Sequence, residues 1–267
     1  MIQYVLPKYD IPIEFIELME SIDNVKIVPY GSSIKGDVTV LEGWDISYVF
    51  DATNVYVLRV TKNELFKNYA EIKGVLKKVA RLNIVITDIE TFVAADNATY
   101  KSVLDCFANE IEMMYKSGGV SQLNLLTDRI ILNEMNNCNA AVESITVAPN
   151  GEFYVCPAFY YGGSESVGSL KEGLLIKNSQ LYKLAYSPIC RNCDAYQCKR
   201  CVWLNSKTTL EINTPSHEQC VVSHLERNKS RELLMSIKAS SSLFAGNDNI
   251  KEIAYLDPFD VKNKWEY

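Results

Sequence analysis

The position of the cysteines constrains this chain more than any other feature. Seven of its eight cysteines lie between Cys138 and Cys220, and the first 137 residues contain only Cys106. One pattern in this region is Cys138-x12-Gly151-x4-Cys156. The other is Cys190-x2-Cys193-x4-Cys198-x2-Cys201, followed after eighteen residues by Cys220. Because two intervening residues let the chain turn both thiols toward one centre, as in zinc and iron-sulfur sites, the spacing predicts a cysteine-ligated metal domain.

The first pattern contains a predicted β-hairpin. The segments 144–148 and 152–155 have a β-type composition and are joined at Pro149-Asn150-Gly151. Asn-Gly is a strong hairpin signal, because both residues tolerate positive φ. The hairpin would return Cys156 to the side at which Cys138 enters, so that two thiols distant in the sequence face one ion.

Composition limits the possible partners and the compartment. The formal net charge is -6, which argues against a surface that neutralises phosphates, so we expect no nucleic-acid partner. No segment approaches the roughly 18 apolar residues of a membrane span, and the first residues do not form a signal peptide. We therefore expect a cytoplasmic protein without a membrane partner. In reducing cytosol, clustered cysteines bind metal or do redox chemistry more often than they form disulfides.

The N-terminal part has the alternating pattern of an α/β fold. Hydrophobic periodicity predicts a mostly parallel βαβ sheet, in which helices return each strand in the same direction. The predicted strands are 2–6, 25–28, 38–41, 55–60, 83–87 and 122–126, and the predicted helices are 12–19, 62–80 and 97–117. Thr61 and Glu64 have the spacing of a capping box at the start of the second helix. We predict an α/β domain over residues 1–137.

The step in cysteine content separates this domain from the next. We predict a Cys-rich metal-binding domain over residues 138–226 and a C-terminal helix and tail over residues 227–267, with a loop at Ser240 to Asp248 before the segment Ile250 to Tyr255. Charged residues at 191, 194, 199 and 200 are atypical of a strand or helix in a core. Seven cysteines cannot fill one tetrahedral site, so we expect two centres, one with four thiolates and one with three and an open position. Spacing alone does not separate iron-sulfur clusters from zinc.

The cysteine pattern resembles a known family arrangement. It is similar to a compact form of the SPASM pattern, found at the C-terminus of many radical SAM peptide-modifying enzymes, with x4 and x2 where that family usually has x5 and x3. The segments 151–159, 193–205 and 213–220 more specifically resemble the CXXX repeat peptide maturase family, and the similarity extends from Tyr56 into Pro258. The resemblance implies that the N-terminal part is a degenerate, partial radical SAM barrel.

The resemblance also implies cofactors and a function. It implies two 4Fe-4S clusters, the first bound by Cys190, Cys193, Cys198 and Cys220 and the second, with one iron open, by Cys138, Cys156 and Cys201. It further implies an accessory maturase component that acts on a ribosomally made Cys-repeat precursor peptide, with a radical SAM enzyme as a possible partner. A zinc-stabilised peptide-binding or interaction module without redox chemistry is the alternative.

One family motif is missing from the residues present. Radical SAM enzymes bind their initiating cluster through Cys-x3-Cys-x2-Cys, and no cysteine precedes Cys106 here. We therefore expect that these residues alone do not cleave S-adenosylmethionine, and whether the chain is itself an enzyme stays open. Cys106 is expected to be a buried small hydrophobe. His217 and His224 flank Cys220 on one helical face, where either a zinc site with Cys220 or a hydrogen bond from His217 to its sulfur is conceivable.

Overall fold

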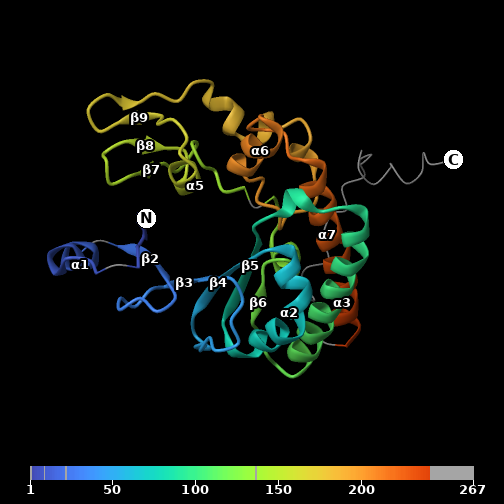
Figure 1. Cartoon of the computed structure of the whole chain (residues 1–267). Coiled ribbons are helices and arrows are strands. Elements are labelled where there is room, and N and C mark those ends of the chain that lie inside the picture. The colour runs from blue at the N-terminus through green and yellow to red at the C-terminus, as the bar shows by residue number, and fades with distance from the viewer. Residues whose placement is uncertain (1, 9, 22, 136, 241–267) are drawn as a thin grey trace. The chain divides into compact units, whose positions relative to one another are not determined.

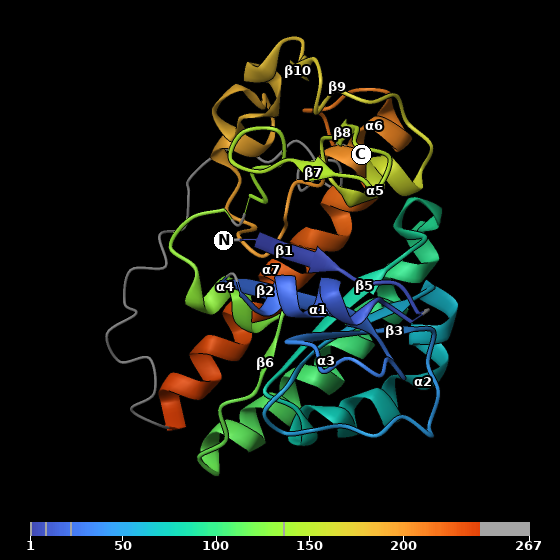
Figure 2. The same ribbon diagram turned by 90° about the vertical axis from the view of Figure 1, so that its left-hand side faces the viewer.

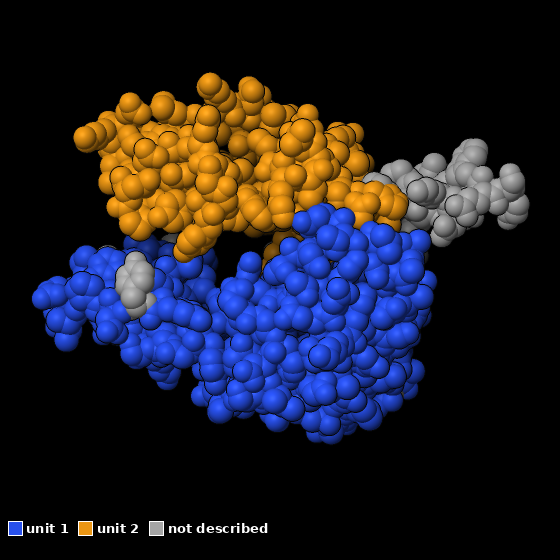
Figure 3. All heavy atoms as spheres, in the orientation of Figure 1, with its two compact units in different colours: residues 1–131, 225–249 blue, residues 132–224, 250–267 orange. Residues whose placement is uncertain are grey.

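The computed structural model describes residues 2–8, 10–21, 23–135 and 137–240 (Figure 1). The chain forms two compact units, one of residues 1–131 and 225–249 and the other of residues 132–224 and 250–267 (Figure 3). The first unit thus takes in residues from both sides of the Cys-rich region. The segment Ile250 to Tyr255, and all of the predicted loop 240–248 except its first residue, lie outside the described residues.

The first unit is built on a six-stranded parallel sheet. Its strands follow one another in chain order: β1 (Ile2–Val5), β2 (Asn24–Pro29), β3 (Val38–Glu42), β4 (Val55–Val60), β5 (Arg81–Ile86) and β6 (Gln122–Leu123). Every neighbouring pair is parallel, with Leu58, for example, opposite Leu41 and Ile84. The predicted α/β class with a mostly parallel sheet is therefore confirmed.

Helices cover part of this sheet. α1 (Ile13–Glu20) joins β1 to β2, whereas β2, β3 and β4 follow one another without an intervening helix. α2 (Lys62–Val75) and the turn η1 (Leu76–Lys78) precede β5, and η2 (Ile89–Thr91) and α3 (Ala94–Lys116) precede β6. In Figures 1 and 2, α2 and α3 lie on the same side of the sheet. Their inward faces bury Leu65, Ile72, Leu104, Phe107 and Ile111.

Local chemistry explains where these elements begin and end. The predicted capping box is present, since the Thr61 side chain accepts from the amide of Glu64 and the Glu64 carboxylate accepts from the amide of Thr61. β6 is shorter than predicted because the Asn124 side chain bonds to both main-chain groups of Ile84, at 2.8 and 2.9 Å. These bonds replace the next rung of the ladder, and α4 (Thr127–Ile131) begins soon afterwards.

The second unit contains short elements. The predicted hairpin is present as β7 (Thr146–Val147) and β8 (Phe153–Tyr154), which pair antiparallel. A second hairpin joins β9 (Gly168–Ser169) to β10 (Gly173–Leu174). The remaining elements are α5 (Pro157–Tyr161), η3 (Ser179–Tyr182), η4 (Leu184–Tyr186), η5 (Cys190–Asn192), α6 (Val202–Thr209) and the first turns of α7 (His217–Ser240).

α7 belongs to both units. Its residues up to His224 contribute to the Cys-rich unit, and its residues from Leu225 pack in the first unit. There the Tyr100 hydroxyl of α3 donates a hydrogen bond of 2.6 Å to the buried carboxylate of Glu226. Within the described residues, no helix is both long and apolar enough to cross a bilayer.

Candidate metal centre

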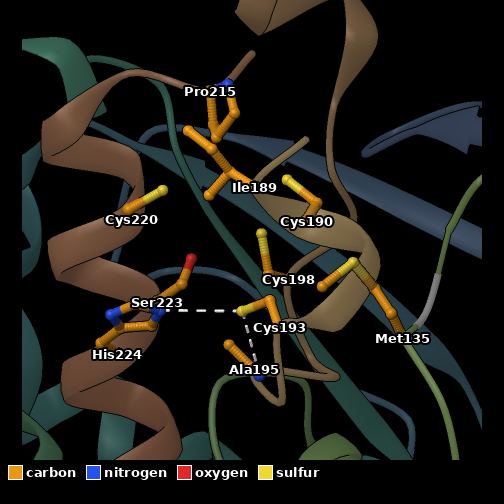
Figure 4. Close-up of a pocket in the computed structure, with 10 residues that line it drawn as sticks. All are labelled: Met135, Ile189, Cys190, Cys193, Ala195, Cys198, Pro215, Cys220, Ser223 and His224. Atoms are coloured by element: carbon orange, nitrogen blue, oxygen red, sulfur yellow. Dashed lines mark hydrogen bonds between the residues drawn. The ribbon is translucent and has the colours of Figure 1, made fainter. Parts of the chain in front are cut away.

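Four of the seven clustered cysteines line one cavity of the second unit. They are Cys190, Cys193, Cys198 and Cys220. Figure 4 shows Cys220 and His224 on α7, facing the segment that carries the other three thiols. Met135, Ile189 and Pro215 complete an apolar wall. Cys190 and Cys220 are buried. We refer to these cysteines as the four-thiol group.

Turns within the sequence place these thiols together. The amide of Cys193 donates to the carbonyl of Cys190 at 3.0 Å, which closes the Cys-x2-Cys turn, and the amide of Cys198 donates to the carbonyl of Ala195 at 2.9 Å. The Cys193 sulfur accepts from the amide of Ala195 at 3.4 Å. Such amide contacts to sulfur are typical of metal-bound cysteines, because they stabilise negative charge on the thiolate.

The other three cysteines form a separate set, the three-thiol group of Cys138, Cys156 and Cys201. Residues close to them in the chain, Ala140, Val155 and Val202, belong to one buried apolar cluster. Cys156 is the N-cap residue of α5 and Cys201 that of α6, and neither side chain makes a capping hydrogen bond. The backbone amides at the start of each helix lower the pKa of the thiol and so partly oppose the effect of burial. Cys138 is exposed, and this group is therefore more accessible than the four-thiol group.

Burial controls the charge state of these thiols. It raises the pKa of Cys190 to about 12, with a further contribution from the neighbouring thiols of Cys198 and Cys193. Burial also raises the pKa of Cys156 and that of Cys201. The nearby thiol of Cys138 raises both pKa values further. At neutral pH these thiols stay protonated unless a metal displaces the protons, because the thiolate is the form that binds metal.

Two charged side chains between these cysteines are buried, contrary to the expectation from composition. Arg200 is 1% exposed and Asp194 is 1% exposed. The Arg200 guanidinium donates to Asn137 Oδ1 at 3.1 Å and to the carbonyl of Tyr182. Burial lowers the pKa of Arg200, and the thiols of Cys190, Cys138 and Cys198 counteract this. Arg200 thus lies close to members of both groups.

The two histidines differ in position. His224 is buried, and its Nε2 lies 3.7 Å from the sulfur of Cys193. His217 has a side chain that is 44% exposed and lies 3.8 Å from the carboxylate of Glu218. His224 therefore contacts the thiol of Cys193, a residue that helical spacing does not point to. Helical spacing puts both histidines near Cys220 and cannot distinguish them.

The seven thiols do not converge on single-ion sites. Over the described part of the chain, no three Cys, His, Asp or Glu side chains are arranged to hold one metal ion. In a zinc site with bonds of about 2.3 Å, neighbouring sulfurs would lie about 4 Å apart. That either group binds metal stays a prediction. Cys106 lies on α3 in the first unit and is only partly buried, so the expectation that it is buried was wrong.

Comparison with known proteins does not assign this chain to a family. No protein-family model matches it, and no curated protein matches it. Membership of a maturase family therefore stays a prediction that rests on the cysteine pattern and its flanking segments. The two thiol groups are the features from which a function can be argued.

Proposed function

We propose that this chain is an accessory component of a peptide-maturation system and carries two 4Fe-4S clusters in its Cys-rich unit. The observation that carries the proposal is that four of the seven thiols line one cavity and the other three, of which Cys138 is exposed, form a separate group. A 4Fe-4S cluster takes four thiolates, and one with three keeps an iron open to another ligand. Cys190, Cys193, Cys198 and Cys220 would hold the first, and Cys138, Cys156 and Cys201 the second.

The donor set suits a cluster. Four thiols line one cavity, which matches the four thiolates that a 4Fe-4S cluster takes. A backbone amide that donates to cysteine sulfur, as that of Ala195 does to Cys193, stabilises the negative charge of such a centre. When bound, the clusters would supply one-electron transfer and, at the open iron, a site for a sulfur ligand.

The surface beside the three-thiol group is aromatic and suits a peptide. Tyr160 lies in the short helix that Cys156 caps, with its ring centroid 5.3 Å from that of Tyr154 and 5.3 Å from that of Tyr161. Tyr161 is 71% exposed. We propose that this surface holds the Cys-repeat precursor while one of its thiolates reaches the open position. The given residues contain no Cys-x3-Cys-x2-Cys motif, so a radical SAM enzyme that acts with this unit would cleave S-adenosylmethionine.

The first experiment measures metal content. Anaerobically purified protein should contain about eight irons and eight sulfides per chain, as two 4Fe-4S clusters require. Cys138→Ser and Cys193→Ser should each reduce the iron content by about half, because each removes a ligand of a different cluster. Cys106→Ser, the matched control, should retain all iron. Colourless protein with stoichiometric zinc after anaerobic reconstitution would instead support the zinc-stabilised module and contradict the clusters.

The second experiment tests the peptide. Adding a Cys-containing peptide to the loaded protein should change the electron paramagnetic resonance spectrum of one cluster, whereas the same peptide with Ser for Cys should not. The change should be lost in Cys138→Ser and kept in Cys193→Ser. Equal responses to both peptides would contradict sulfur ligation at the open position.

A further inference from the structure

Arg200 occupies an unusual position in the Cys-rich unit. It lies between Cys198 of the four-thiol group and Cys201 of the three-thiol group, and its side chain is 1% exposed. Its φ of 42° is in the left-handed region, which is rare for a residue other than glycine and carries a conformational cost. A surface role would require neither the burial nor this backbone conformation.

The guanidinium group is anchored by neutral partners alone. It donates to the side-chain oxygen of Asn137, the residue next to Cys138, and to the carbonyl of Tyr182. Within the described chain, no carboxylate pairs with it, and Nη1 has no hydrogen-bond partner. A buried cation without a counter-charge destabilises the fold. The anchors fix the group in place but do not compensate its charge.

The negative charge that could balance Arg200 is on the cysteines or on what they hold. The charged forms of Cys190, Cys138 and Cys198 all act on Arg200, so both groups are within electrostatic reach. A metal converts neutral thiols into thiolates and so supplies this charge when it binds. We therefore expect the charge of Arg200 to be balanced when the thiol groups hold metal.

We propose that Arg200 is a positioning residue that serves as the common counter-charge of both thiol groups and raises the reduction potentials of the clusters they hold. This inference rests on the proposed function. A fixed cation stabilises the reduced form of a cluster, which carries one more negative charge, relative to the oxidised form.

The test is an anaerobic redox titration of the full chain with dithionite, followed by electron paramagnetic resonance. Arg200→Gln removes the charge and should shift at least one cluster to lower potential by about tenfold in its reduction equilibrium, or 59 mV for one electron. Arg200→Lys should recover most of that shift. Arg191→Gln, which removes an exposed arginine next to Cys190, should leave the potentials unchanged.

A second variant keeps the inference testable if Arg200→Gln does not fold. Asn137→Asp places a carboxylate on the guanidinium and should lower the potential while Arg200 is retained. Unchanged potentials in fully loaded Arg200→Gln or in loaded Asn137→Asp would overturn the inference, as would an equal shift in Arg200→Lys and Arg200→Gln. Wild-type protein without iron would instead refute the proposed function, so the two failures are distinguishable.

Discussion

Substitution of the two histidines of α7 should have different effects, because His224 contacts the sulfur of Cys193. Nε2 of His224 lies 3.7 Å from the Cys193 sulfur, whereas His217 is largely exposed. A hydrogen-bond donor at a ligand sulfur stabilises negative charge there and tunes the potential of the centre. The buried ring also closes the cavity beside the four-thiol group.

We predict that His224→Ala lowers the reduction potential of the four-thiol centre and weakens its retention of iron by about tenfold, the range found for outer-shell partners of metal ligands. Iron content after dialysis against a chelator and redox titration measure the two effects. His217→Ala, the matched control, should behave as wild type. Equal effects of the two substitutions would contradict the assignment of the contact to His224.

At the level of single residues, the sequence predicts some features of the site and not others. Spacing predicts seven cysteines as ligands, and their binding of metal stays a prediction. The turn within each Cys-x2-Cys pair is local, so the sequence can indicate it without the rest of the fold. It does not predict the burial of Arg200 and Asp194, since charged residues are seldom fully buried. The one signal in the sequence is that Arg200 stands between two cysteines of different groups. Whether a charged residue is buried depends on tertiary packing, which neither cysteine spacing nor composition predicts.

At the scale of elements, local signals predict position better than length. The strand at 55–60, the capping box at Thr61 and the hairpin turn at 149–151 all occur where the pattern places them. The helix predicted for 62–80 instead ends at Val75 and continues as a 3-10 turn, and the strand predicted for 122–126 ends at Leu123. The end of this strand depends on the hydrogen bond between Asn124 and Ile84, which lies forty positions away in the chain. Hydrophobic periodicity cannot predict such a contact.

Two glycines, one in the hairpin turn and one in a helix, should respond oppositely to substitution by alanine. Gly151 has φ of +79°, and a Cβ there would meet only Leu170, at an ordinary 3.6 Å, so Gly151→Ala should cost about 1 kcal/mol from backbone strain alone. Gly74 lies within α2, where an added Cβ meets nothing. Gly74→Ala should therefore stabilise by about 0.5–1 kcal/mol. Urea unfolding measures both, and the same sign for the two substitutions would contradict these assignments.

The link between α3 and the second part of α7 gives a further prediction. Tyr100→Phe removes the donor to the buried carboxylate of Glu226 and should cost about 1.5–3 kcal/mol, the range for a hydrogen bond to a charged group. Tyr115→Phe removes a hydrogen bond of 3.1 Å to the neutral carbonyl of Ser121 and should cost about 1 kcal/mol. Denaturant unfolding compares them, and a smaller loss in Tyr100→Phe would indicate that Glu226 is not charged.

For the whole molecule, the two units differ in what stabilises them. The first has a six-stranded sheet covered by long helices, with a core that includes Leu58, Leu65 and Phe107, each fully buried. The second has strands of two residues, and its described residues include apolar clusters built on four and on three buried residues. Ordering some ninety residues costs conformational entropy, and we predict that metal bound to the thiols helps to offset that cost.

We therefore predict that removing the metal unfolds residues 132–224 and leaves the parallel sheet folded. Hydrogen exchange of metal-free protein should show loss of protection in the Cys-rich unit, with β4, β5 and α3 still protected. Because α7 runs through both units, its first two turns should lose protection while the turns after Leu225, held by Tyr100, keep theirs. Full protection of residues 190–224 without metal would show that packing alone stabilises this unit, and the thiol groups would then have no role in its folding.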